Sequence, residues 1–270
     1  MSDDLLQAVQ EYVEANIGAF HEKRLHTVQR RPVNEILKRK NPYLFKAKHQ
    51  DATQLIRSIL DAFISSQEET LFGEFLEGVA VFVAERVNNG YKPSVDEVTG
   101  IDLVFEKNNI VYVVDIKSGP NWGNSSQVNK MYRNFSEAID SLGSRYPHHT
   151  IVPVNGCMYG KDRKPRKIGK IRESGEVVGE ITYWKICGQD FWYFISNEKQ
   201  LYLEIIEPLG TGADQRNRAF RDEYDKFINK ATTIFLADFL HQDYSVDWDR
   251  LTQFVSASEN EDIFLDLALR

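Results

Sequence analysis

Two short apolar segments separated by a polar stretch constrain the fold of this chain most strongly. Residues 101–105 and 110–116 are rich in Ile, Val and Phe, and Asn108 and Asn109 lie in the stretch between them. Asparagine tolerates the positive φ angles that a two-residue hairpin turn requires. The pattern therefore predicts an antiparallel hairpin of two β-strands joined by these two asparagines.

The register of this predicted hairpin brings three charged residues together. Counting back from the turn, Asp102 lies opposite Asp115, and directly opposed residues have Cβ atoms about 5 Å apart. Lys117 follows Asp115 by two residues and therefore points to the same side of the strand. Two carboxylates this close need a cation, and hard oxygen ligands with no Cys or His nearby favour Mg²⁺, with Mn²⁺ as a substitute.

This composition suits phosphodiester hydrolysis by a metal-activated water, which Lys117 would orient or deprotonate. The alternative is a structural ion pair between Asp115 and Lys117 at a strand end. Spacing alone does not separate the two readings, because Asp162-Arg163-Lys164 has the same spacing in a polar segment without strand character. The apolar strand around Asp115 favours the catalytic reading, since unpaired charges are costly to bury there.

The rest of the chain reads as helices around further strands. Apolar residues at helical spacing predict helices at residues 5–17, 52–64, 69–88 and 217–240. A further helix is predicted up to about Ser141, with Ser125 or Ser126 as its N-cap. Strands are predicted at residues 150–158, 181–186 and 201–206. We predict an α/β fold, a mixed β-sheet flanked by helices with helical N- and C-terminal additions. It forms a single domain over 1–270, divided into 1–66, 67–208 and 213–270.

Charge and cysteine content exclude several classes of protein. The formal charge of −7 argues against a protein that only coats nucleic acid, although nine Lys or Arg occur in residues 23–48 and seven in residues 161–172. Cys157 and Cys187 suggest neither a disulfide framework nor a zinc site. The longest apolar run is far below the roughly 18 residues that span a bilayer, and the first residues lack a secretory signal, so we expect a cytoplasmic protein.

The hairpin residues resemble the motif of the PD-(D/E)XK nuclease superfamily: Ile101-Asp102, then Asp115-Ile116-Lys117. Ile101 replaces the Pro of that motif, and Asp is less usual than Glu at position 115. Over residues 40–160 the chain is similar to type II restriction endonucleases of the PmeII-like and TdeIII-like group. The resemblance implies a restriction-endonuclease-like core and a magnesium-dependent homodimer that cuts a short palindromic site in double-stranded DNA. It also implies a cognate DNA methyltransferase as functional partner and suggests a GC-rich interrupted palindrome.

The superfamily often adds a helical glutamate before the hairpin, for which Glu74 and Glu77 are the candidates. Glu77 is preferred as a further catalytic and metal-binding residue, because it follows Gly73 by one turn and Glu74 lies on a stripe with Glu85. A solvated surface glutamate is the alternative reading.

Two segments carry the predicted DNA contacts. Asn124, Ser125 and Gln127 follow the catalytic strand and can approach a phosphate, although the first two can instead simply cap the next helix. The basic segment 161–172 is the candidate for reading bases, because Arg and Lys make the commonest contacts to guanine edges. The residues singled out there are Lys161, Arg163, Lys164, Arg166 and Lys167.

Three alternatives to a restriction enzyme remain open. A repair or recombination nuclease of the same fold would recognise DNA structure and give a smear of fragments. A non-catalytic DNA-binding partner protein would bind DNA without cutting it. A small-molecule metal hydrolase would need a closed pocket and leaves the two basic segments unexplained.

Overall fold

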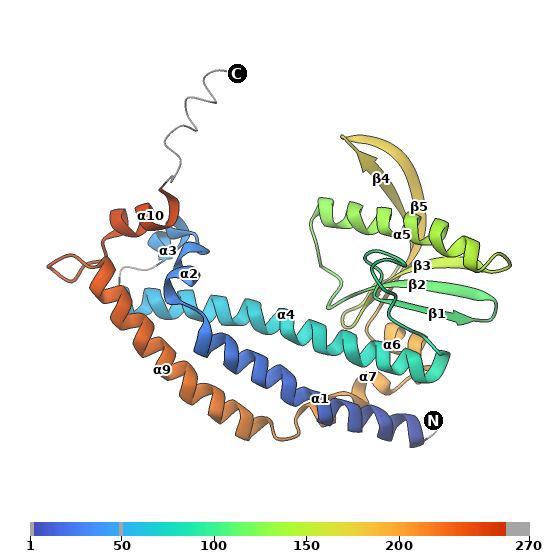
Figure 1. Ribbon diagram of the computed structural model, residues 1–270, viewed down its shortest axis with the longest axis horizontal. Helices are drawn as coiled ribbons and strands as arrows, with labels where there is room; N and C mark the ends of the chain where they lie inside the picture. The colour runs from blue at the N-terminus through green and yellow to red at the C-terminus, as the bar shows by residue number, and fades with distance from the viewer. Residues whose placement is uncertain (1–2, 49–50, 258–270) are drawn as a thin grey trace. The chain divides into compact units, whose positions relative to one another are not determined.

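The computed structural model describes residues 3–48 and 51–257, which form two compact units. Of the described residues, 3–20 and 72–213 belong to the first unit, and 21–48, 51–71 and 214–257 belong to the second. Two long helices, α1 (Asp3–Arg30) and α4 (Ala52–Asn88), contribute residues to both (Figure 1). That the chain folds as a single endonuclease domain stays a prediction.

A five-stranded mixed sheet forms the centre of the first unit. Its strands are β1 (Leu103–Lys107), β2 (Ile110–Lys117), β3 (Thr150–Cys157), β4 (Arg166–Glu173) and β5 (Glu176–Cys187). They lie in the order β1-β2-β3-β5-β4, with β2, β3 and β5 parallel and the two outer strands antiparallel to their neighbours. The α/β class is therefore confirmed.

Helices cover both faces of this sheet, which explains why its strand β2 reads as a nearly continuous apolar run. Helix α5 (Ser125–Arg145) buries Phe135 and Leu142 against one face (Figure 1). The opposite face packs against the ends of α1 and α4 that belong to this unit and against α6 (Gln189–Ser196), with Val83 and Phe191 fully buried. The hairpin β1-β2 is thereby held between two apolar layers.

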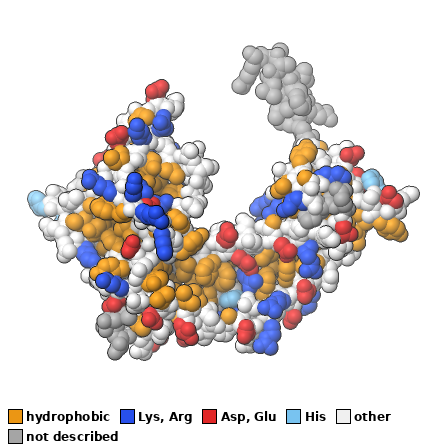
Figure 2. Space-filling view, turned by 180° about the vertical axis from the view of Figure 1, so that it is seen from behind, with side chains coloured by type: hydrophobic (Ala, Val, Ile, Leu, Met, Phe, Trp, Pro, Cys, Tyr) orange, Lys and Arg blue, Asp and Glu red, His pale blue; other side chains and the backbone are white. Residues whose placement is uncertain are grey.

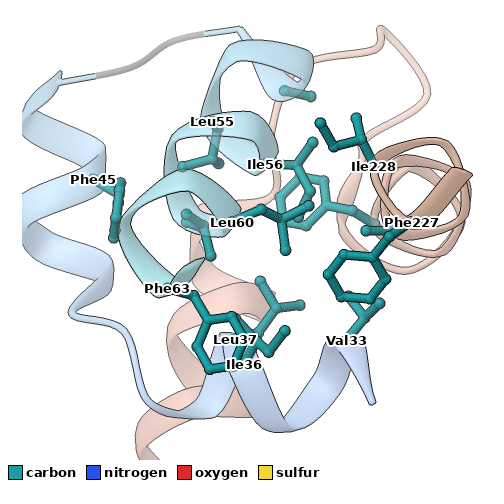
Figure 3. Packing of buried hydrophobic residues seen from close by; sticks show 14 of the residues in the cluster. Val33, Ile36, Leu37, Phe45, Leu55, Ile56, Leu60, Phe63, Phe227 and Ile228 are labelled. Atoms are coloured by element: carbon teal, nitrogen blue, oxygen red, sulfur yellow. The ribbon is translucent and has the colours of Figure 1, made fainter. Parts of the chain in front are cut away.

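The second unit is helical and has its own core. It contains α2 (Val33–Lys38), α3 (Pro42–Lys48), α10 (Trp248–Ser256) and nearly all of α9 (Ala213–Phe239). Leu55, Ile56 and Leu60 of α4 pack in this core with Phe227 of α9 (Figure 3). The helix predicted at 217–240 is confirmed as α9.

Several predicted elements differ from those observed. Residues 201–206 are not a strand but the short helices α7 (Leu201–Glu204) and α8 (Ile206–Leu209), because Leu201 and Ile205 are buried at helical spacing. The separate helices predicted at 52–64 and 69–88 are one helix, α4. Strand β4 and helix α6 were not predicted.

The surface carries its charges in patches. On the face drawn in Figure 2, Lys and Arg side chains lie in several groups among hydrophobic and acidic side chains. None of the helices within the described residues is long and apolar enough to cross a membrane.

Candidate active site

The β1-β2 hairpin has the predicted turn and register. Asn108 and Asn109 have φ angles of 54° and 62°, as a two-residue turn of this type requires. Leu103 pairs with Val114, so the next pair beyond β1 sets Asp102 opposite Asp115. The Asp102 N–H donates a hydrogen bond to the Val114 carbonyl oxygen at 2.9 Å, which holds Asp102 beside β2 just before β1 begins.

Asp102, Asp115 and Lys117 lie together at the end of this hairpin. Lys117 Nζ donates a hydrogen bond to Asp115 Oδ1 and lies 3.9 Å from Asp102 Oδ2. The Ile116 N–H donates to Asp102 Oδ2 at 2.8 Å, which fixes that carboxylate against β2. The predicted contact among the three side chains is therefore present in the structure.

Asp115 is the most strongly buried of the three, with 5% of the residue exposed. The pKa of Asp115 is raised to about 7, chiefly by burial; Lys117 acts in the opposite direction, and the charge of Asp102 acts in the same direction as burial. Asp115 Oδ2 is buried and has no hydrogen-bond partner among the residues that the structure describes. A buried carboxylate oxygen without a partner is costly, so this atom is suited to accept a cation.

A cavity of about 520 Å³ opens in front of these charges. Asp102, Asp115 and Lys117 form one wall, and helix α5 forms another. The remaining lining residues are Thr99, Gly100, Trp122, Gly123, Gln127, Lys130, Met131 and Asn134. The space exceeds what a hydrated metal ion needs and is open to solvent, so it can admit part of a larger anionic substrate.

Two polar residues that line this cavity, Lys130 and Asn134, were not singled out from the sequence. Lys130 and Asn134 follow Gln127 by three and seven residues, which is the spacing of one helix face, so α5 presents all three to the cavity. That spacing could have identified them. Trp122 had no comparable signal, because it lies in the loop before α5.

The residues after the catalytic strand have the capping role that was the alternative prediction. Asn124 is the N-cap of α5, with its side chain accepting a hydrogen bond from the Gln127 N–H at 3.1 Å. Gln127 Oε1 accepts from the Asn124 N–H at 2.9 Å, which completes a capping box. The prediction of Ser125 or Ser126 as the cap was therefore wrong, and Ser125 is the exposed first residue of α5.

Glu77 does not join the carboxylate pair. Its Oε1 accepts a hydrogen bond from Lys92 Nζ at 2.5 Å. This bond raises the pKa of Lys92, and the negative charges of Glu77, Asp102 and Glu74 raise it to a smaller extent. Within the described ranges, no group of three His, Cys, Asp or Glu side chains could hold a metal ion. Glu74 is exposed, as the helix pattern indicated.

The basic segment divides between a loop and the edge strand β4. Lys161, Arg163 and Lys164 are exposed in the loop, and Arg166 and Lys167 begin the strand. These five residues, all of which the structure describes, do not line the cavity.

Arg166 and Lys167 have different surroundings because successive strand residues point to opposite faces. Arg166 is exposed and pairs in register with Trp184, which is 40% exposed. Lys167 is half-buried, and its Nζ lies 2.9 Å from the Asp162 carboxylate. Asp162 also accepts from the Lys164 N–H at 2.8 Å, so the second Asp-x-Lys sequence forms a local turn.

The family model described as "Type II restriction endonuclease EcoO109I" matches residues 7–217, which is most of the chain. No curated protein matches the sequence significantly.

Proposed function

Because the chain belongs to the type II restriction endonuclease EcoO109I family, we propose that it hydrolyses double-stranded DNA at a short palindromic site. Membership of this family makes it a DNA endonuclease of the restriction type. The observation that carries this proposal is the contact among Asp102, Asp115 and Lys117 beside an open cavity. The restriction-endonuclease-like fold agrees with it, since a mixed sheet is flanked by helices on both faces.

The donor set fits a hard divalent cation. Asp102 and Asp115 would hold Mg²⁺, or Mn²⁺ in its place, and the partnerless Asp115 Oδ2 is an oxygen atom available for it. Two carboxylates leave further positions for water and phosphate oxygens. When bound, the cation would polarise the phosphoryl group and lower the pKa of a bound water. Glu77 as a third ligand stays a prediction, because it contacts Lys92.

The protein's own residues would supply orientation and charge. Asp102 is fixed by the Ile116 N–H, so this carboxylate has a defined direction. Lys117 brings a positive charge to the same face, where it can orient the attacking water, accept or donate a proton, and offset the negative charge that develops on the phosphate. The α5 wall, with Gln127, would contact the substrate backbone.

Base reading would come from the basic segment and not from the cavity. Arg166 is the preferred residue, because it is exposed on the outer strand beside Trp184, whereas Lys167 is engaged with Asp162. Lys161, Arg163 and Lys164 are exposed in the adjoining loop and can contact phosphates or bases.

The assembly follows from the proposed substrate. A palindromic site has two-fold symmetry, which a homodimer matches. We therefore propose a cytoplasmic homodimer that functions beside a DNA methyltransferase of the same specificity. Membership of the PmeII-like and TdeIII-like group, with its GC-rich interrupted palindrome, remains a prediction.

Cleavage of phage DNA tests the proposed activity. The wild type with Mg²⁺ is compared with the same protein in Ca²⁺ and with Asp115→Asn in Mg²⁺, and products are separated on a gel. We expect discrete fragments from the first reaction alone, because the variant loses a charged metal ligand with little change of shape. A smear would favour a structure-directed nuclease, and intact DNA would favour a DNA-binding partner protein.

Binding measurements on Arg166→Ala test the base-reading assignment. A base contact predicts that affinity for the cognate site falls by about 1–3 kcal/mol, with affinity for random DNA unchanged. An equal loss on both DNAs is the signature of a phosphate contact and would contradict the assignment.

A further inference from the structure

A buried side-chain amide lies on β3, the strand next to β2 in the sheet. Asn155 of β3 is 1% exposed and is the in-register neighbour of Asp115 in the parallel β2-β3 pair. Its Nδ2 donates a hydrogen bond to the Asp115 carbonyl oxygen at 3.2 Å. Its Oδ1 accepts from the indole N–H of Trp122 at 3.0 Å. Asn155 thus joins the catalytic strand to the loop that precedes α5.

Trp122 in turn lies against the catalytic lysine. Lys117 Nζ is 5.1 Å from the centroid of the Trp122 ring, within the range of a cation–π interaction. Trp122 is neither in a helix nor in a strand, and it lines the cavity. Its hydrogen bond to buried Asn155 therefore anchors a ring that secondary structure does not hold.

We propose that Trp122 is a positioning residue that holds the Lys117 ammonium at the catalytic face, and that Asn155 fixes Trp122 for this purpose. The inference rests on the proposed nuclease function. Lysine has a long flexible side chain, and its other partners here are Asp115 Oδ1, the Ile116 carbonyl oxygen and, at 3.9 Å, Asp102 Oδ2.

The geometry gives Trp122 a role that the carboxylate cannot fill. A divalent cation on Asp115 Oδ2 would draw charge from the carboxylate that Lys117 contacts and would repel the ammonium. An aromatic face attracts a cation without carrying a charge that a metal would neutralise. The Trp122 ring would therefore still attract the Lys117 ammonium when a divalent cation is bound.

Variants of Trp122 separate this role from DNA binding and from simple packing. Trp122→Phe keeps a ring but loses the N–H, and Trp122→Leu loses both, while Asn121→Ala is a matched change at an exposed position of the same loop. With enzyme in excess over DNA, we expect single-turnover cleavage to fall about tenfold to thirtyfold in the Leu variant and less in the Phe variant. Asn121→Ala should cut at the wild-type rate.

Two further measurements identify a merely structural effect. DNA affinity in Ca²⁺ should be the same in both Trp122 variants as in the wild type. Both variants leave the buried Asn155 Oδ1 without its indole donor, so both should lose stability in urea, and the Phe variant should nonetheless cut faster than the Leu variant. Wild-type cleavage by Trp122→Leu would overturn the proposal. A loss of affinity that parallels the loss of rate would also overturn it, by assigning Trp122 to DNA contact. Equal cleavage rates in the Phe and Leu variants would overturn it by assigning the loss to the hydrogen bond alone and not to the aromatic ring.

An NMR experiment tests the contact without catalysis. The chain has four tryptophans, and the indole N–H signal of Trp122 is the one missing from Trp122→Phe. We expect Lys117→Met to shift this signal and leave the other three in place; an unmoved Trp122 signal would refute the contact. If the wild type cuts no DNA, the proposed function fails. The shift of the indole signal in Lys117→Met then still tests whether the Trp122 ring contacts Lys117.

Discussion

Replacing Asp115 with Asn should stabilise the metal-free protein at alkaline pH, although it abolishes the proposed activity. The Asp115 carboxyl is buried, and its Oδ2 has no hydrogen-bond partner among the described residues. Ionising it without a metal is therefore unfavourable, even beside Lys117. Asparagine has nearly the same shape as the protonated aspartic acid and carries no charge to bury.

The expected size follows from the pKa of Asp115, which burial raises from 3.8 to about 7. A carboxyl with a raised pKa stabilises the folded state at pH below its unfolded value, and this contribution is lost as the pH rises through the folded value. The difference spans about three pH units, which at roughly 1.36 kcal/mol per unit gives an upper bound of about 4 kcal/mol. We expect about 2 kcal/mol at pH 8, because an amide imitates a protonated carboxyl imperfectly.

Urea unfolding in EDTA measures this difference between the two proteins. At pH 8 the Asp115→Asn protein should be the more stable, and the advantage should shrink towards pH 5, where wild-type Asp115 is protonated. Mg²⁺ at ten times its dissociation constant should stabilise the wild type by about 1.4 kcal/mol and leave the variant unchanged. A variant less stable than the wild type at pH 8, or a difference independent of pH, would refute the reasoning.

Two predictions concern the elements that build the site. Asn124→Ala should lower the free energy of unfolding by about 1 kcal/mol through loss of the α5 cap, whereas Ser126→Ala should have little effect; equal effects in urea titrations would contradict Asn124 as the cap. Gly156→Ala should cost about 1–3 kcal/mol, because a Cβ there would lie 2.4 Å from the Phe191 ring. Gly143→Ala is the control, since nothing lies within 4 Å of its Cβ position, and it should stabilise α5 by about 0.5–1 kcal/mol in the same assay. A harmless Gly156→Ala would show that Phe191 can move.

The parts of the site that depend on local geometry could be predicted from the sequence. A two-residue turn at Asn108 and Asn109 fixes every pair of the hairpin, so the placement of Asp102 and Asp115 at the same end of it follows by counting. Residues 201–206 show where counting fails, because a short apolar run fits a buried strand and a buried helix equally well. The interaction of Glu77 with Lys92, fifteen residues along the chain, was likewise not readable from the helix pattern.

The properties that make the site reactive come from contacts between distant parts of the chain. Asp115 and Lys117 occupy one strand, but the burial that raises the pKa of Asp115 depends on the helices packed on both faces of the sheet. The Trp122 ring lies beside Lys117, and its indole N–H donates to Asn155, which is thirty-three residues away in the sequence. Asn155 is within reach because β3 pairs with β2 in parallel. The hairpin alone thus determines which charged side chains lie together. The order of the strands determines how deeply Asp115 is buried and which residues surround the Lys117 ammonium. Changes in strand packing should therefore alter catalysis without altering any ligand.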